Sequence, residues 1–308
     1  MSLKTINRMK LGLFTLLLAS FPFLNGCFIK SMAVNSVADG LAGQGDTFSS
    51  DNDPELIREA VPFSLKFMES ILSATPRHVA LLTALAKDFT EYGYAFVQSD
   101  SQYIGESDYA KSKELKQRAK KIYIRARDYG LRGLDVRRDH FSEMLPLSPQ
   151  ATAAKIDNKE DVELLYWTGV SWMAAISIDK NDMDLLADRT QAEALIYRAY
   201  ELDPDFDSGS IHNFLITYEA SRPGGSIEKA KEHYKRALEL NQGQDASSYV
   251  NYAENIDEAE HNQEEFEEML HKALAIDPDK KPSWRLVNLI MQKRAKWLLS
   301  RVETLFVK

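Results

Sequence analysis

Apolar and small side chains recur at helical spacing along most of the chain. In residues 230–241 (AKEHYKRALELN), Ala230, Tyr234 and Ala237 are spaced i, i+4, i+7, so they share one face of a helix. Leu238 widens this stripe, and charged side chains occupy the opposite face. A helix this polar cannot bury such a stripe alone. The stretch therefore predicts a helix that packs closely against a neighbouring helix.

The same periodicity predicts helices from Asp53-Pro54-Glu55 onwards, where Asp suits an N-cap and Pro the first helical position. Pro62 is expected to kink this first helix or to shift its start. Residues 99–108 read as a loop, and residues 142–160, with two prolines, as an excursion between helices. The remaining predicted helices cover 77–98, 109–130, a short segment after Gly130 or Gly133, 161–178, 185–202, 207–219, 230–241, 246–258, 264–276 and a long closing helix at 283–306.

A repeat of helix pairs is indicated by the small residue that precedes each helix stop. Ala199, Ala237 and Ala273 are separated by 38 and 36 residues, and Ala126 precedes Ala199 by 73, about two such periods. Helix pairs with a period near 34 residues that end in A-L-x-L-x-P are typical of tetratricopeptide repeats. We therefore expect an all-α fold, a degenerate tetratricopeptide-like array of helical hairpins (an α-solenoid) with a long C-terminal helix.

Two positions depart from that pattern. A large aromatic residue stands where the pattern expects a small one: Phe266 in the last copy and Tyr218 in the preceding one. Generic helical hairpins with coincidental spacing are the alternative. Composition favours helix in either case, since Pro (10) and Gly (14) are few for a turn-rich β protein of 308 residues. A net charge of −8, with no long basic stripe, argues against nucleic-acid binding.

The N-terminus carries the pattern of a lipoprotein signal peptide. Lys4, Arg8 and Lys10 precede an apolar core, Leu11–Phe23, which is too short to span a bilayer. The sequence Leu24-Asn25-Gly26-Cys27 follows and resembles a bacterial lipobox, in which cleavage before Cys27 exposes that residue for acylation. An ordinary secretory signal with a chance cysteine is the alternative. Cys27 is the only cysteine, so an intramolecular disulfide is excluded.

These features predict residues 1–26 as the signal peptide, 27–50 as a lipidated tether rich in Gly, Ser and Thr, and 51–308 as the helical domain. Cleavage removes three basic side chains, which leaves 35 Lys and Arg against 46 Asp and Glu, a charge of −11. Phe28 in place of Asp after the cysteine implies sorting to the outer membrane. We expect a lipid-anchored protein that faces the periplasm.

No motif of a known catalytic or cofactor site is present: the chain lacks a P-loop, G-x-G-x-x-G, G-x-S-x-G and H-E-x-x-H. His261 lies near Glu264 and Glu265, but this acidic run reads as a solvated helix face. With a single cysteine, thiolate metal sites are excluded. We therefore predict no enzymatic activity, no cofactor and no metal site.

Aromatic residues on the first helix of each predicted pair are the best candidates for binding. In solenoids these helices line the concave surface on which ligands dock, although each ring alone reads as packing between repeats. The candidates for ligand or partner binding are Tyr94, Phe96, Trp167, Trp172 and Tyr218, together with Arg222 in the Arg222-Pro223-Gly224-Gly225 turn.

Taken together, these segments resemble the TatT family, tetratricopeptide lipoproteins associated with tripartite ATP-independent periplasmic (TRAP) transporters. The resemblance rests on the lipobox and on the segments DPELIREAVPFSLKFMESILSATP, EYGYAFVQ, ARDYGLRGLD, KEDVELLYWTGVSWMAAISI, YRAYELDPDF, SRPGGSIEKAKEHYKRALEL, LAIDPD and QKRAKWLL. It implies an accessory component of a TRAP-type uptake system that binds the substrate-binding protein. It also implies homo-oligomers (a trimer) with cavities that pass a small, hydrophobic ligand. A periplasmic scaffold that binds another envelope protein is the alternative function.

Overall fold

The computed structural model describes residues 34–43 and 45–307. All regular structure in these residues is helical, which confirms the predicted all-α fold. The signal peptide and the lipobox, Cys27 included, lie outside the described residues. Within the described part, no helix has the length and apolar character that a membrane crossing requires.

The described chain starts with a helical segment at 34–42 and α3 (Gly45–Ser49). Short 3-10 turns and two π-helical segments, η1 and η5, interrupt the α-helices that follow. In chain order these are α4 (Pro54–Ala74), α5 (Val79–Tyr92), η1 (Gly93–Gln98), α6 (Ser99–Ile104), η2 (Gly105–Asp108), α7 (Tyr109–Arg137), α8 (Phe141–Met144), α9 (Pro149–Ala153), η3 (Lys159–Asp161), α10 (Val162–Ile178), α11 (Met183–Ala187), α12 (Arg189–Leu202), η4 (Phe206–Gly209), α13 (Ser210–Ser221), α14 (Ile227–Asn241), α15 (Ala246–Tyr252), η5 (Ala253–Asp257), α16 (Glu258–Glu260), α17 (Gln263–Leu274), η6 (Pro278–Lys280), η7 (Pro282–Trp284), α18 (Arg285–Leu299) and α19 (Val302–Leu305).

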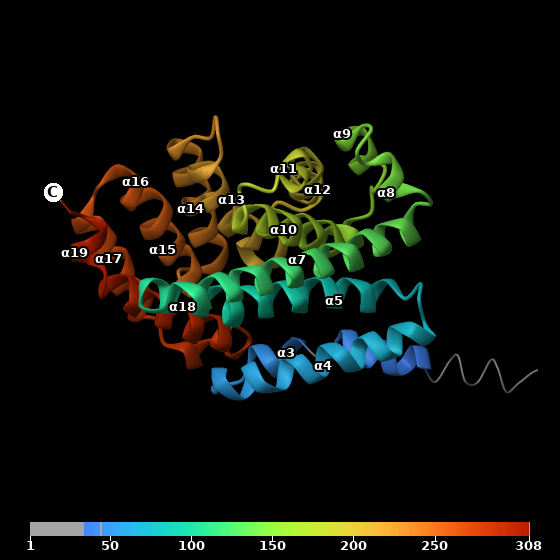
Figure 1. Cartoon of the computed structure of the whole chain (residues 1–308), viewed down its shortest axis with the longest axis horizontal. Coiled ribbons are helices and arrows are strands. Elements are labelled where there is room, and N and C mark those ends of the chain that lie inside the picture. The colour runs from blue at the N-terminus through green and yellow to red at the C-terminus, as the bar shows by residue number, and fades with distance from the viewer. Residues whose placement is uncertain (1–33, 44, 308) are drawn as a thin grey trace, which may run out of the picture.

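Helices that are close in sequence pack in pairs: α5 with α7, α10 with α12, α13 with α14, and α15 with α17. Figure 1 shows α10 lying along α7, with α11 and α12 above it and α5 below. α4 packs against the outer side of α5, and α3 contacts α18. Apolar side chains form two buried clusters, a larger N-terminal one drawn from residues 38–218 and a C-terminal one drawn from residues 216–298. Tyr94 packs against both.

The stripe predicted on residues 230–241 is buried as expected. Within α14, Ala230 and Ala237 have no exposed surface, and Tyr234 is 9% exposed. Ala199 and Ala273, the small residues aligned with Ala237 in the other copies, are equally buried. The aligned small residues are therefore fully buried in all three of these helices.

α7 is longer than predicted, because Gly130 and Gly133 do not end it. A Cβ atom on Gly130 would lie 2.1 Å from Oγ1 of Thr168, and one on Gly133 would lie 2.8 Å from Cδ1 of Leu164. Both partners belong to α10. The two glycines thus allow α10 to pack closely on α7, and the separate short helix predicted after them is wrong.

Two further boundaries differ from the prediction, whereas α4 starts at Pro54 as predicted. Residues 99–108, predicted as a loop, continue the helix through α6 and η2. α4 runs through Pro62, since buried side chains before and after the proline hold the whole helix against α5. The closing helix is shorter, because α18 ends at Leu299 and a turn separates it from α19.

Part of the segment predicted as a tether belongs to the folded body. Residues 34–42 are helical, and Ala38 and Leu41 are buried in the N-terminal cluster. Nε2 of His78, the N-cap of α5, lies 3.0 Å from Oδ1 of Asp39. The sequence feature that could have indicated this packing is the presence of apolar residues in a segment otherwise rich in Gly and Ser.

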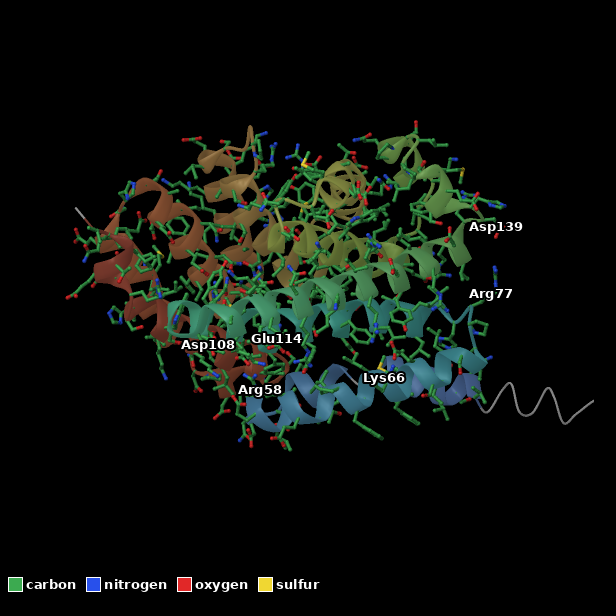
Figure 2. The ribbon with its side chains drawn as sticks, viewed as in Figure 1. Arg58, Lys66, Arg77, Asp108, Glu114 and Asp139 are labelled. Atoms are coloured by element: carbon green, nitrogen blue, oxygen red, sulfur yellow. The ribbon has the colours of Figure 1, made fainter. Side chains whose placement is uncertain are left out.

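Ion pairs and hydrogen bonds link both α4 and α18 to α6. On α18, the guanidinium of Arg294 donates from Nε to Oε2 of Glu254 (2.6 Å) and from Nη1 to Oε1 of Gln102 (2.8 Å). On α4, Arg58 (Figure 2) donates from Nη2 to Oδ1 of Asp100 on α6 (3.2 Å). Arg294 is only 5% exposed. α4 and α18 are therefore both linked to α6 through buried or half-buried charges.

Gly169 is the point at which α10 and α12 are closest. A Cβ atom there would lie 2.5 Å from Cγ1 of Ile196 and 3.0 Å from the carbonyl oxygen of Ala192, a backbone atom that cannot rotate away. We predict that Gly169→Ala lowers the free energy of unfolding by about 1–3 kcal/mol through overpacking. Chemical denaturation measures this. Gly40→Ala is the control, since a Cβ atom at Gly40 meets nothing within 4 Å; equal effects of the two changes would contradict the prediction.

Candidate functional site

Two surfaces bring polar side chains from different helices together. The first is an open groove between α9 and α12, here called the outer groove. The second is a group of charged side chains from α5, α10 and the start of α13, here called the inner charged cluster. The described residues contain no group of three or more His, Cys, Asp or Glu side chains placed to hold a metal ion.

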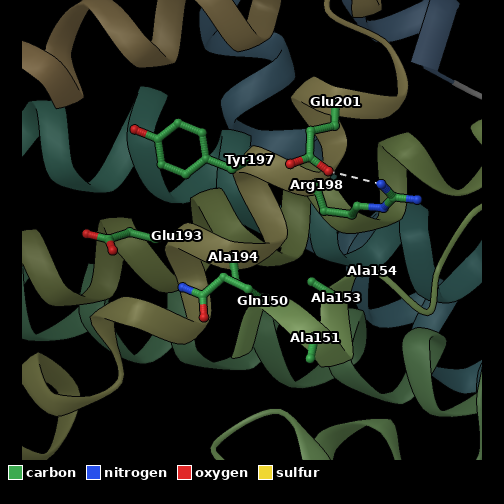
Figure 3. A pocket seen from close by; sticks show the side chains of 9 residues that line it. All are labelled: Gln150, Ala151, Ala153, Ala154, Glu193, Ala194, Tyr197, Arg198 and Glu201. Atoms are coloured by element: carbon green, nitrogen blue, oxygen red, sulfur yellow. Dashed lines mark hydrogen bonds and ion pairs between the residues drawn. The ribbon is translucent and has the colours of Figure 1, made fainter. Parts of the chain in front are cut away.

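The outer groove has a volume of about 510 Å³. Figure 3 shows its small alanine side chains and, around them, the tyrosine, arginine and carboxylates of α12. One pair of these is linked, because Nη1 of Arg198 lies 3.0 Å from Oε2 of Glu201. Its lining residues are Gln150, Ala151, Ala153, Ala154, Glu193, Ala194, Tyr197, Arg198 and Glu201. A shallow groove with an apolar floor and a polar rim suits a protruding side chain or helix of a partner protein.

A reciprocal pair of tyrosine–glutamate hydrogen bonds lies behind this groove, between α12 and α13. Oη of Tyr197 donates to Oε1 of Glu219 (3.0 Å), and the hydroxyl of Tyr218 donates to Oε1 of Glu193. Arg222 donates from Nη2 to both carboxylate oxygens of Glu219, at 2.9 and 3.1 Å. Each carboxylate is thus held by a neighbouring helix, which orients the α12 face that lines the groove.

Charge compensation keeps Glu219 ionised although its side chain is buried. Burial acts to raise its pKa, but the hydrogen bonds from Arg222 and Tyr197 outweigh it, and the pKa of Glu219 is lowered. The same carboxylate and burial raise the pKa of Tyr197 to about 12. The tyrosine therefore remains a hydrogen-bond donor at any physiological pH.

The inner charged cluster consists of Lys87, Asp88 and Glu91 on α5, Glu163 on α10 and Asp207 before α13. Nζ of Lys87 lies 3.6 Å from Oε1 of Glu163 and 6.0 Å from the centre of the Trp167 ring. Glu91, followed by Glu163 and Asp207, raises the pKa of Lys87, which burial opposes. One ammonium group is thus shared among several carboxylates.

Two carboxylates of this cluster have raised pKa values. Burial and the neighbouring Glu91 raise the pKa of Asp88 to about 7. Burial also raises the pKa of Glu91, although the Glu91 side chain reaches solvent. Perturbed carboxylates close to a cation are typical of functional surfaces.

The backbone next to this cluster is strained. Asp207 (φ 47°, ψ 46°) and Ser208 (φ 54°, ψ 32°) both adopt the left-handed conformation, and Gly209 follows with φ 106°. Two successive non-glycine residues in this region are unfavourable and need support from their surroundings. Support comes from Tyr166, whose Oη donates to the carbonyl oxygen of Ser210 (3.0 Å). The strain places the Asp207 carboxylate within the electrostatic reach of Lys87.

The predicted binding residues lie in several different surroundings. Trp167 adjoins the inner charged cluster. Tyr218 and Arg222 belong to the network behind the outer groove, with the guanidinium 5.7 Å from the Tyr218 ring. The other three pack elsewhere: Tyr94 lies near Arg294, Phe96 lies under Arg58 at 5.0 Å, and Trp172 lies under Arg127 at 5.0 Å. A binding role for the six residues stays a prediction.

The groove-lining residues of α12 are not among the residues predicted from the sequence, because the aromatic candidates were all on the first helix of each predicted pair. Glu193, Tyr197 and Glu201 are spaced i, i+4, i+8 and so form one polar stripe on this second helix. A tyrosine between two carboxylates on the face opposite the buried alanines was the available signal. No feature of the sequence indicated that Glu219 would be buried in a network, because its burial depends on how α13 packs against α12.

Comparison with known proteins identifies one family. The model of the TRAP transporter T-component family matches residues 50–306. An uncharacterized protein of Treponema pallidum (strain Nichols) is 28% identical over 309 residues, covering 94% of this chain and 96% of the relative. The match includes both the outer groove and the inner charged cluster.

The raised pKa of Asp88 makes a prediction about pH. Asp88 titrates at about 7 in the folded protein and near 3.8 when unfolded, so between these values the folded state holds the additional proton. The contribution of Asp88 to stability therefore falls as pH rises through this window. We predict that Asp88→Asn, which is neutral throughout, raises the melting temperature relative to the wild type increasingly between about pH 4 and pH 8.

Melting curves of both proteins across this pH range test the prediction. Asp139→Asn is the control, because Asp139 is exposed in the turn after α7 (Figure 2). Its effect on the melting temperature is expected to be constant over the same range. A difference between Asp88→Asn and the wild type that does not change with pH would refute the assignment.

Proposed function

We propose that this chain, which belongs to the TRAP transporter T-component family, is a lipid-anchored accessory component of a TRAP-type uptake system. In this role it binds the substrate-binding protein of the system. The family match over residues 50–306 carries this proposal. The helical pairs support a degenerate tetratricopeptide-like scaffold, a design used mainly to bind other proteins. No enzymatic role is proposed.

The outer groove is the proposed docking face for the substrate-binding protein. Small alanine side chains leave room for a protruding element, and Glu193, Tyr197 and Arg198 at the rim offer hydrogen bonds and charge. Exposed Leu147 (83%) in the α8–α9 turn and Met183 (70%) on α11 flank this side of the molecule. Together they provide apolar contacts around a polar, oriented centre.

The inner charged cluster is the proposed contact for a small ligand of the system. Its carboxylates and Lys87 would bind polar groups, and the Trp167 ring beside Lys87 supplies an apolar face. This surface is more polar than a path for a hydrophobic ligand requires. The ligand that we propose therefore carries polar or charged groups as well as an apolar part.

Anchoring is proposed through acylated Cys27 in the outer membrane, with the body in the periplasm. The lipobox motif and the apolar segment before it support this.

Two changes in the groove test the docking face. We predict that Ala151→Arg, which fills the floor, and Glu201→Lys, which reverses a rim charge, each lower capture of the substrate-binding protein about tenfold, the effect of losing one well-packed contact. Immobilised protein is incubated with the purified substrate-binding protein of the same system, and the bound fraction is measured.

Glu268→Lys is the matched control, since Glu268 on α17 is also an exposed glutamate paired with a basic residue on its own helix, Lys272 at 2.7 Å. It is expected to bind like the wild type. No capture by the wild type would refute the partner. Full capture by both groove variants would refute only the docking face.

Mass spectrometry of the full chain, expressed in a bacterium and extracted from its membranes, tests the anchor. We expect a mature protein that begins at Cys27 and carries acyl chains. Cys27→Ser is expected to abolish both cleavage at this site and acylation. A mature protein with an unmodified Cys27 would contradict the proposed anchoring.

A further inference from the structure

Large apolar side chains are exposed along one side of α4. Leu56 is 54% exposed, Phe63 77% and Phe67 42%. Their spacing of i, i+7, i+11 places them on one face of the helix, here called the α4 stripe. The rings of Phe63 and Phe67 stack with their centres 6.3 Å apart and their planes within 2° of parallel. The two rings thus form one apolar surface, and Leu56 lies on the same face about two helical turns before them.

The α4 stripe contributes nothing to the core. The opposite face of α4 carries the buried side chains Ile57, Val61, Leu65, Met68 and Leu72, which pack towards α5. A helix needs only one such face to join the fold. Contiguous exposed apolar residues outside the core usually mark a surface that contacts another body.

The position of α4 indicates which body that is. Residues 34–74 form the lower layer in Figure 1, on the opposite side of the molecule from α9, α11 and α12. Val37 in this layer is also 45% exposed. Only residues 28–33 separate Cys27 from the described helix, which starts at Val34, and seven extended steps reach about 25 Å. An acyl chain on Cys27 therefore holds this layer close to the bilayer.

The charges around the α4 stripe are nearly balanced. Glu55, Glu59 and Lys66 are exposed on the same side of the helix, and Lys293 of α18 lies 3.5 Å from Glu55, so two acidic and two basic side chains surround the stripe (Figure 2 shows Lys66). Two other charges are turned towards the body: Arg58 pairs with Asp100, and Glu69 accepts a hydrogen bond from Oη of Tyr129 (2.7 Å). A face with aromatic rings and little net charge suits a largely zwitterionic lipid surface better than a strongly charged protein.

We propose that the α4 stripe lies against the membrane, with Phe63 and Phe67 in contact with the lipid headgroups and upper acyl chains. This rests on the anchoring through Cys27 proposed above. It fixes the orientation of the body: the 34–74 layer faces the lipid, and the outer groove faces away from it, open to a partner in the periplasm.

A labelled fragment tests the orientation without depending on acylation. Residues 28–308 contain every described residue and no cysteine, so Phe63→Cys and Leu147→Cys each introduce a unique thiol for an environment-sensitive fluorophore. An N-terminal hexahistidine replaces the lipid and tethers the fragment to phosphatidylethanolamine–phosphatidylglycerol vesicles that contain nickel-chelating lipid. Leu147 is the matched control, because it is as exposed as Phe63 but lies on the groove side.

Nitroxide lipids are expected to quench the label at position 63 at least about threefold more than the label at 147, since only the first approaches the acyl chains. Equal quenching at the two positions would overturn the proposal. A blue shift at position 63 that grows with protein concentration in the absence of vesicles, together with sedimentation as an oligomer, would assign the α4 stripe to a second copy and also overturn it. Failure of the proposed acylation shows separately, as an unmodified Cys27 in the mass spectrum of the full chain.

Discussion

Close packing of α10 between α7 and α12 is the constraint on which the arrangement of both candidate surfaces depends. On one side Gly130 of α7 admits Thr168, and on the other Gly169 of α10 admits Ile196. Because neither contact leaves space for a methyl group, both helix–helix distances are tightly limited. The same α10 directs Glu163 and Trp167 towards α5, while its partner α12 directs Tyr197 into the outer groove. The inner and outer surfaces are therefore two consequences of one packing arrangement.

Local patterns predicted the helices well where burial follows one periodic stripe. Ala230, Tyr234 and Ala237 are buried as their spacing requires. The errors occurred where a residue with a strong local preference serves a distant contact. Gly130 read as a helix end, but it accommodates Thr168, which lies 38 positions further along the chain. Likewise, the burial of Glu219 follows from the meeting of two helices, a property that no window of sequence contains.

α18 is held in place by a buried charge as well as by apolar packing. Arg294 is nearly buried, and its guanidinium is satisfied by Glu254 and Gln102 from separate segments. A buried charge that loses its partner is strongly destabilising, whereas the intact pair adds little net stability. Its main effect is thus to specify one arrangement: α18 fits only where both partners are present. This specificity suits a helix whose own sequence does not determine where it docks.

A lipid anchor limits the distance of a protein from a membrane but leaves its rotation free. A flexible tether alone would therefore present every face of the molecule to the periplasm in turn. In this protein only residues 28–33 lie between Cys27 and the helical segment 34–42, which packs into the body through Ala38 and Leu41. The α4 stripe adds contact points at a distance from the anchor, and a body held at several points on a surface has one preferred orientation. The α9–α12 side is then the face most distant from the lipid, where a soluble partner meets it without competing with the membrane.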